Sequence, residues 1–294
     1  MSDSCSLPMF TVDSFTDTPF SGNPAAVCLL SWEFPEHLMQ PIAREMNLSE
    51  TAFIERLNAA DDFRSSRHFK LRWLTPTCEV NLCGHATLAA AAVLFKALEN
   101  PADVITFSTL SGQLKAKRDG EKICLDLPLN EPEPQDIGLD SNIQQLVLGS
   151  DLPLQEVFYS AATKKLVLRL PDSVSRGQLE ALPVPNQLRM LESHDASRVR
   201  GVIVTIKSCS DDKYDFFSRY FAPWNGIAED PVTGSAHTVL APYWAKQLGV
   251  SRPLNARQVS PRGGDLVLRI AGDRLEVLGA ACVVMKGELL LPAA

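Results

Sequence analysis

The sequence contains the same glycine turn twice, and this duplication constrains the fold more than any other feature. The copies, Glu79-Val-Asn-Leu-Cys-Gly-His-Ala86 and Glu229-Asp-Pro-Val-Thr-Gly-Ser-Ala236, are separated by a constant offset of 150, which is 229 − 79. A second matching pair, Ser111–Leu114 and Gly263–Leu266, follows at an offset of 152, which is 263 − 111. Solenoid repeats have periods of a few tens of residues, so this spacing predicts a duplicated domain instead.

The length of 294 residues fits two domains of about 150 residues each. Three prolines lie between Pro128 and Gln135, which makes this stretch the expected linker. An apolar strand at 280–285 is left over after the second copy, and we expect it to cross back to the first half. The predicted domains are therefore 1–128 with 279–294, and 129–278, with an active site in the cleft between them.

Each half is expected to place several antiparallel strands around one buried helix. The apolar character of residues 86–98 extends nearly all round a helix, which predicts burial, and residues 235–248 form its counterpart. Helices do not alternate with strands as they do in βαβ units, so the fold class is α+β. Strands are expected at 10–15, 26–30, 51–57, 69–74, 104–107, 112–127, 155–160, 165–170, 200–207, 214–221 and 264–278, and further helices at 35–46 and 174–181.

Composition excludes several classes of function. The net charge is −7 and basic residues form no long run, which argues against a nucleic-acid partner. The N-terminus does not resemble a signal peptide, and the longest apolar run, 86–95, is too short to span a bilayer. Seven scattered cysteines without CxxC spacing indicate reduced thiols in the cytoplasm and no zinc site. Signatures for dinucleotides, ATP and serine hydrolysis are also missing from the sequence.

Glu50 is the first candidate for chemistry. It follows the amphipathic helix at 35–46, precedes the strand at 51–57, and has apolar residues close on both sides. Apolar surroundings raise the pKa of a carboxyl group from about 4.3 towards neutrality, which suits a proton carrier. A glutamate in a turn is more often simply solvated, and the pattern leaves that alternative open.

The two glycine turns supply the other candidates. Gly84 with His85, and Gly234 with Ser235, lie at the starts of the buried helices, where free N–H groups attract anions such as a substrate carboxylate. Asp230 precedes the second start. Thr233 or Ser235 could equally act as a helix cap, and His85 could be a structural residue, but the recurrence of the turn favours a shared site.

Four segments resemble the signatures of the phenazine biosynthesis isomerase-like family, in the family's order. These segments are Gly22–Val27, Asn47–Phe53, Leu82–Thr87 and Glu229–Ala236. The resemblance spans nearly the whole chain. It implies a fold like that of diaminopimelate epimerase, with two barrel-like halves, each wrapped around a central helix.

The resemblance also implies roles for individual residues. Glu50 matches the family's catalytic proton carrier. His85 and Asp230 match catalytic cleft residues, and Gly84, Gly234 and Ser235 match residues that bind the substrate. Members of the family are commonly homodimers and use no metal and no organic cofactor.

One difference from diaminopimelate epimerase narrows the mechanism. That enzyme has a cysteine before the glycine of each turn, whereas this chain has Cys83 in the first turn and Thr233 in the second. A threonine hydroxyl is far too weak an acid to replace a thiol. We therefore expect a single-carboxylate proton shift through Glu50, and Cys83 could be only a small apolar residue.

Two hypotheses of different classes follow. The first is a cofactor-independent isomerase that shifts a proton on a small carboxylate-bearing substrate. The second is a protein-binding or scaffold protein that retains the isomerase fold, with little or no catalysis and with a protein partner. The retention of Glu50, His85 and Asp230 favours the first hypothesis without excluding the second.

Overall fold

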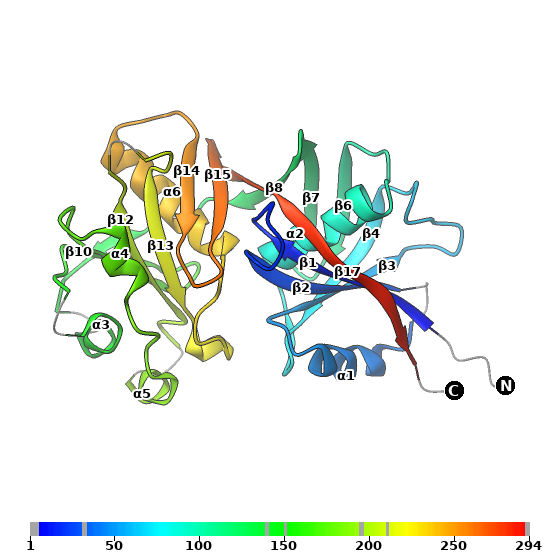
Figure 1. The fold of residues 1–294 in the computed structure, drawn as a ribbon, viewed down its shortest axis with the longest axis horizontal. Coiled ribbons are helices and arrows are strands. Elements are labelled where there is room, and N and C mark those ends of the chain that lie inside the picture. The colour runs from blue at the N-terminus through cyan, green and yellow to red at the C-terminus, as the bar shows by residue number, and fades with distance from the viewer. Residues whose placement is uncertain are drawn as a thin grey trace. The chain divides into compact units, whose positions relative to one another are not determined.

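The computed structural model describes residues 6–30, 34–138, 141–149, 152–193, 197–209 and 212–291. The chain forms two compact units, and each is considered by itself. The first unit comprises Met1–Asp126 and Leu278–Ala294, and the second comprises Leu127–Val277. Figure 1 shows the ribbon with its elements labelled.

The first unit is a curved sheet around one helix. Its elements are β1 (Ser6–Ser14), β2 (Asn23–Leu30), α1 (Glu36–Met46), β3 (Thr51–Arg56), β4 (His68–Leu74), β5 (Glu79–Val80), α2 (Gly84–Ala92), β6 (Val104–Thr109), β7 (Gly112–Asp119), β8 (Lys122–Pro128) and β17 (Ala281–Leu290). The strands pair in the order β17, β1, β2, β3, β4, β6, β7, β8. The pairs β2–β3 and β4–β6 are parallel and the others are antiparallel. The strand expected at 280–285 thus belongs to β17, which runs along β1.

Helix α2 forms the core of this unit. Every residue from His85 to Ala92 is buried, and the helix contacts β1, β2, β3, β7 and β17 (Figure 1). Four consecutive alanines, Ala89 to Ala92, let the strands approach on all sides, because a methyl group occupies little space. A small-residue helix surrounded by sheet has no polar face, which explains why its sequence is apolar nearly all round.

The sequence predicts one continuous helix over 86–98, but the α-helical part, α2, ends at Ala92. After Ala92 the chain widens into a π-helical segment, η1 (Val93–Ala97), in which the N–H of Leu98 bonds the carbonyl of Val93 at 2.9 Å. Arg118 lies over the Phe95 ring at 4.5 Å and donates to the Phe95 carbonyl at 3.3 Å. A guanidinium from β7 therefore binds a carbonyl of the widened turn, and a local sequence pattern does not reveal such a contact.

The second unit repeats the pairing pattern of the first. Its elements are β9 (Glu133–Gln135), α3 (Ser141–Leu148), β10 (Glu156–Ser160), β11 (Lys165–Arg169), α4 (Arg176–Glu180), α5 (Gln187–Ser193), β12 (Gly201–Lys207), β13 (Phe216–Phe221), η2 (Pro223–Asn225), α6 (Gly234–Leu248), β14 (Leu254–Gln258), β15 (Gly264–Ala271) and β16 (Arg274–Gly279). The pair β11–β12 is parallel like β2–β3, and β13–β14 is parallel like β4–β6. Antiparallel pairs alternate with them in both units.

Helix α6 is the counterpart of α2 and is held by aromatic packing. The Trp244 ring stacks on Phe216 of β13 with centroids 5.5 Å apart, and its N–H donates to Thr205 of β12 at 3.0 Å. Tyr243 meets Phe158 of β10 edge to face at 4.7 Å. This helix thus packs against three strands of its own unit. The α+β class expected from the sequence, with one central helix in each unit, is confirmed.

Some elements depart from the expected pattern. The stretch expected to be only a linker contains β9, which pairs antiparallel with β10. Helices α3 and α5 and strand β14 had no clear sequence signal. Strand β14 is too short to give a clear sequence pattern. It is a strand because it pairs with β13 on one side and with β15 on the other.

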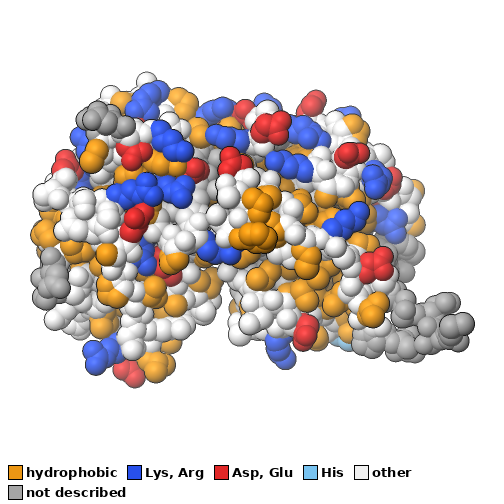
Figure 2. All heavy atoms as spheres, in the orientation of Figure 1, with side chains coloured by type: hydrophobic (Ala, Val, Ile, Leu, Met, Phe, Trp, Pro, Cys, Tyr) orange, Lys and Arg blue, Asp and Glu red, His pale blue; other side chains and the backbone are white. Residues whose placement is uncertain are grey.

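The face shown in Figure 2 agrees with the absence of a long basic run in the sequence. Lys and Arg lie among Asp and Glu on the face shown in Figure 2, without a continuous basic stripe there. All described cysteines, which exclude Cys5, are free thiols. Among the described residues, the helices are too short or too polar to cross a membrane.

Candidate functional site

Glu50 is held at the junction between α1 and β3. Helix α1 ends at Met46, and the next residue, Asn47, has a left-handed backbone with φ of 49°, which turns the chain towards the sheet. The Glu50 carbonyl accepts a hydrogen bond from Ala26 of β2 at 3.3 Å. Only 8% of the residue is exposed, so the solvated alternative is wrong. The backbone is fixed by the sheet while the carboxylate lies inside the unit.

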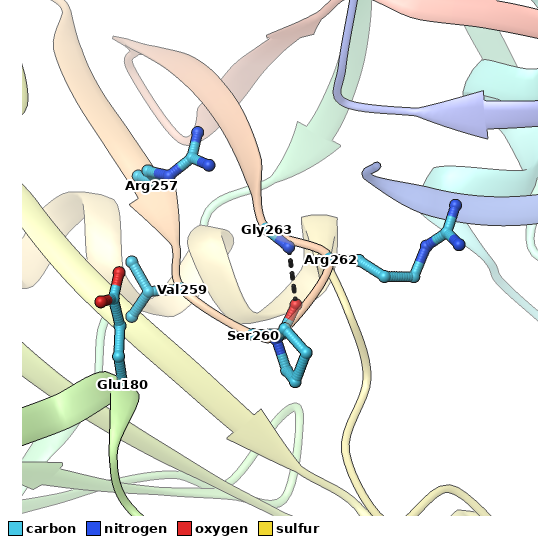
Figure 3. Close-up of a pocket in the computed structure, with 7 residues that line it drawn as sticks. Glu180, Arg257, Val259, Ser260, Arg262 and Gly263 are labelled. Atoms are coloured by element: carbon cyan, nitrogen blue, oxygen red, sulfur yellow. Dashed lines mark hydrogen bonds between the residues drawn. The ribbon is translucent and has the colours of Figure 1, made fainter. Parts of the chain in front are cut away.

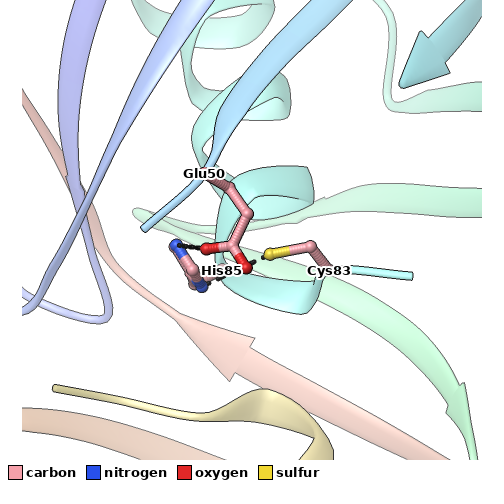
Figure 4. Close-up of side chains that lie close together, drawn as sticks. All are labelled: Glu50, Cys83 and His85. Atoms are coloured by element: carbon pink, nitrogen blue, oxygen red, sulfur yellow. Dashed lines mark hydrogen bonds and ion pairs between the residues drawn. The ribbon is translucent and has the colours of Figure 1, made fainter. Parts of the chain in front are cut away.

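His85 contacts both Glu50 and Cys83. Its Nε2 lies 3.2 Å from Glu50 Oε2, and its Nδ1 lies 3.4 Å from Cys83 Sγ (Figure 4). The contact with Glu50 has the distance of a hydrogen bond but not the full alignment of one. His85 is 5% exposed and Cys83 is 7% exposed. The imidazole therefore lies between a carboxyl group and a thiol, within one buried group of side chains.

Burial decides the charge of this imidazole. Desolvation lowers the pKa of His85 to about 3, so the ring is neutral at physiological pH. A neutral imidazole donates through one nitrogen and accepts through the other. Because the imidazole is neutral, its contact with Glu50 is not a pair of opposite charges. This arrangement suits transfer of a proton through Glu50.

The start of α2 leaves donor groups for a ligand. Cys83 precedes the helix in an extended conformation, and no side chain caps the first turn. Its carbonyl accepts from Thr87 Oγ1 at 2.5 Å, which ties the turn to the helix. Gly84 is half-buried and has no side chain to block its surface. The N–H groups of a first turn carry partial positive charge and bind anions.

The second turn is held by a network around Asp230. Thr233 Oγ1 donates to Asp230 Oδ2, and the Asp230 N–H donates to the Tyr220 carbonyl at 3.0 Å. Gln258 closes the turn, because its amide donates to the Asp230 carbonyl at 2.5 Å and accepts from the Thr233 N–H at 2.9 Å. Gly234 and Ser235 then begin α6. Asp230 as a whole is 6% exposed.

The alternative that Thr233 caps the helix through its side chain is wrong. Thr233 occupies the N-cap position of α6, but no side chain makes a capping hydrogen bond there. Its hydroxyl is used by Asp230 instead. Because the hydroxyl hydrogen is directed at a carboxylate, Thr233 serves to orient Asp230. His237, which follows, is fully buried, and its Nδ1 lies 2.8 Å from the Thr233 carbonyl, so it is a packed histidine.

The candidates thus form two groups. The first unit brings together Glu50 and His85 with Cys83, beside Gly84. The second unit brings Asp230 together with Thr233, directly before the first turn of α6 that contains Gly234 and Ser235. Sequence reasoning missed Gln258, which closes the second turn. A lone glutamine carries no sequence signal.

The cluster of Glu50, Cys83 and His85 also has the residue types of a metal site. Their donor atoms lie within 4.8 Å of one another. Glu50 lies at Nε2 and Cys83 lies at Nδ1 of the same ring (Figure 4). One ion binds a histidine through one nitrogen only, so an ion here would replace at most one of these two contacts.

A separate cavity of about 300 Å³ lies in the second unit, at the end of β14 and the loop that follows it. It is lined by Glu180, Arg257, Val259, Ser260, Pro261, Arg262 and Gly263 (Figure 3). Its loop is closed on itself, since the Gly263 N–H donates to Ser260 Oγ at 3.1 Å, and Arg257 is paired with Asp265 at 2.5 Å. The sequence-predicted residues do not line this cavity, and we assign it no role in the chemistry.

Comparison with known proteins gives one consistent result. A family model described as phenazine biosynthesis-like protein matches residues 12–287. The phenazine biosynthesis-like domain-containing protein of Homo sapiens is 49% identical over 287 residues, covering 96% of this chain and 99% of that protein. An uncharacterized isomerase of Pseudomonas aeruginosa is 41% identical, covering 97% and 99% respectively.

Solved structures agree with this result. A phenazine biosynthesis protein of the PhzF family from Enterococcus faecalis superimposes with a TM-score of 0.84 at 37% identity, covering 98% of this chain and 100% of that chain. A hydroxyproline epimerase from Agrobacterium vitis superimposes with a TM-score of 0.56 at 12% identity, covering 99% and 94%. At 12% identity, the likeness to the hydroxyproline epimerase is one of fold alone. The family model and the relative named as an isomerase indicate isomerase-type activity.

Proposed function

Because the chain belongs to the phenazine biosynthesis-like family, we propose that it is a cofactor-independent isomerase. It shifts a proton on a small carboxylate-bearing substrate, and Glu50 is the acid and base. The observation that carries this proposal is the contact of 3.2 Å between Glu50 Oε2 and a buried, neutral His85. A carboxyl group in such a place can both accept and return a proton.

The proposed reaction uses one proton and no other reactant. The Glu50 carboxylate takes a proton from a carbon next to an unsaturated or carboxylate-bearing group, and the C–H electron pair moves into that group. The double bond shifts, and the protonated Glu50 returns the proton to another carbon. The substrate is thereby isomerised, and Glu50 is again a carboxylate.

The other candidates bind the substrate in this proposal. The N–H groups at Gly84 attract its carboxylate, because the start of α2 carries partial positive charge and has no side-chain cap. Asp230 accepts hydrogen bonds from polar groups, and Gly234 with Ser235 contributes backbone donors. The hydroxyl of Thr233 is bonded to Asp230, which supports a mechanism with one base.

Deuterium incorporation tests this proposal. The protein would be incubated in deuterated water with itaconate and with trans-4-hydroxy-L-proline, the molecule bound to the Agrobacterium vitis epimerase. NMR or mass spectrometry would then detect carbon-bound deuterium. We expect incorporation with the wild type and a loss of at least about a hundredfold with Glu50→Gln.

Glu45→Gln is the matched control, because it makes the same chemical change at an exposed position of α1. Equal incorporation by wild type and Glu50→Gln would contradict the role of Glu50. No incorporation with either probe or with a wider set of unsaturated acids would instead favour the non-catalytic, protein-binding alternative.

A further inference from the structure

The loop that joins β14 to β15 is longer than its counterpart in the first unit. Residues 110–111 alone join β6 to β7, whereas residues 259–263 join β14 to β15. The strands themselves correspond, because both pairs are antiparallel neighbours. All of residues 259–263 line the cavity of about 300 Å³. The extra length of this loop therefore builds one wall of the cavity.

Hydrogen bonds hold the loop in one shape. The Val259 N–H donates to the Ser218 carbonyl at 2.8 Å, and Ser260 Oγ donates to the Pro231 carbonyl at 2.8 Å. The Gly263 N–H closes the loop by donating to Ser260 Oγ at 3.1 Å. The wall is thus tied to β13 and to the turn before α6. A wall fixed in this way forms a pre-organised site.

The guanidinium of Arg257 lies directly against the end of this loop. Gly263 has a φ of 62°, and a Cβ atom there would lie 2.8 Å from Arg257 Nη2. Both the left-handed backbone and the nearby guanidinium therefore favour glycine at this position. In the view of Figure 3, Gly263 lies between the side chains of Arg257 and Arg262. The loop and the two arginines together form the cationic side of the cavity.

Part of the Arg257 guanidinium remains available to a ligand. Among the described residues, its hydrogen bonds use Nη1 alone, which donates to Asp265 Oδ1 at 2.5 Å and to the Tyr214 hydroxyl at 3.3 Å. Nε and Nη2 keep their N–H donors. The side chain is 27% exposed, so an anion bound there would be partly shielded from water. A guanidinium binds a carboxylate or a phosphate through two such donors in parallel.

The charges around the cavity favour an anion. Arg257 and Arg262 line it beside one carboxylate, that of Glu180. Arg176 offsets this carboxylate, because its Nε lies 2.8 Å from Glu180 Oε1. Cations therefore outnumber carboxylates at this wall, even though Asp265 shares the charge of Arg257.

We propose that this cavity binds a small oxyanion, a carboxylate or a phosphate, through the Nε and Nη2 groups of Arg257. Arg262 adds positive potential at longer range. A volume of about 300 Å³ is at the small end of ligand sites, which suits a small anion. Because Ser260 binds the Pro231 carbonyl, an anion that fixes the loop also stabilises the turn before α6. The inference does not depend on the proposed isomerase reaction.

Titration of the full chain with sodium phosphate and, separately, with sodium acetate tests the site. Sodium chloride keeps the ionic strength constant, so that general screening does not change. NMR of nitrogen-labelled arginine side chains should show a saturable shift of the Arg257 signal, which Arg257→Met assigns. At an anion concentration of ten times Kd, the unfolding equilibrium constant should fall about elevenfold. The anion that binds more tightly identifies the ligand as a phosphate or a carboxylate.

Substitutions of opposite sign separate binding from stability. Arg257→Met should weaken the binding at least about tenfold, and Arg262→Met about twofold. Glu180→Gln should tighten it about threefold, because it removes the carboxylate from the cavity wall. Arg269→Met is the matched control, since this half-exposed arginine of β15 does not line the cavity, and it should leave the affinity unchanged.

Binding of neither anion at constant ionic strength overturns the inference. Binding that persists unchanged in Arg257→Met also overturns it, because the anion would then lie elsewhere. Should Arg257→Met not fold, Glu180→Gln provides the test, and an affinity that does not rise in this variant contradicts the site. These results need no isomerase substrate, so they stand or fall independently of the deuterium experiment.

Discussion

The guanidinium of Arg219 and the carboxylate of Glu229 form a buried two-bond fork, with Nε–Oε1 at 2.6 Å and Nη2–Oε2 at 2.7 Å. The first unit contains the same fork between Arg72 and Glu79, with both bonds at 2.8 Å. The two glutamates begin the duplicated sequence pattern. Each fork therefore anchors the turn that leads into the central helix of its unit.

Loss of the second fork should destabilise the protein more than loss of the first. The Arg219 and Glu229 side chains are 2% and 8% exposed, whereas Arg72 and Glu79 are 16% and 25% exposed. Arg219→Met removes the cation that pairs with the buried Glu229 carboxylate, which should lower the free energy of unfolding by about 3–5 kcal/mol. Arg72→Met should cost about 1 kcal/mol, because water solvates Glu79. Urea unfolding checks both values, and equal losses would contradict the role of burial.

Gln258 should matter for the geometry of Asp230. Gln258→Ala removes both hydrogen bonds that close the turn, leaving the Asp230 carbonyl and the Thr233 N–H buried without this partner. Each buried polar group that loses its hydrogen-bond partner lowers the free energy of unfolding by about 1–3 kcal/mol. We expect the proposed exchange reaction to slow at least about tenfold in protein that is still folded by circular dichroism. Unchanged exchange would show that the turn keeps its shape without Gln258.

His85 should remain neutral well below the usual pKa of a histidine. Burial lowers its pKa to about 3, so the ring nitrogens should keep neutral-imidazole chemical shifts from pH 8 down to pH 5. NMR of nitrogen-labelled histidine measures this directly, and His85→Asn assigns the signal. A titration centred near 6.5 would instead mean that the imidazole is solvated or charged by Glu50.

His237 should make the protein less stable in acid. Burial lowers its pKa to about 4 in the folded chain, while the unfolded chain takes up the proton near 6.5. The unfolded state therefore binds more protons between these values, and stability falls as the pH falls from about 6.5 to about 4. His237→Asn should reduce this slope by about 1 kcal/mol per pH unit in urea unfolding. His37→Asn makes the same chemical change at an exposed position and controls for the substitution itself.

Much of the fold could be predicted from the chain because its signals are local. The turn before Gly84 and its copy before Gly234 predict where the central helices begin, and both do begin at these glycines. Strand β14 and helices α3 and α5 could not be predicted in this way. Their short segments acquire their structure from neighbours, such as β13 and β15 on either side of β14.

The candidate site, like the fold, could be predicted from the sequence only in part. Glu50, His85 and Asp230 are recognisable in the sequence because each lies in a motif with a helix start or a turn. The contact of 3.2 Å between Glu50 and His85 joins residues 35 positions apart, and it exists because β3 and α2 pack together. No local pattern contains that distance.

The sequence by itself determined the duplication, the α+β class and the residue types at both turns, since periodicity and helix starts are properties of neighbouring residues. Only the tertiary structure decided which partners these residues have. Arg72 and Arg219 are 147 positions apart, so they do not follow the offset of 150 that relates Glu79 to Glu229, yet they make the same fork. Burial, which lowers the pKa values of His85 and Lys165, is likewise a property of packed elements and not of the chain order.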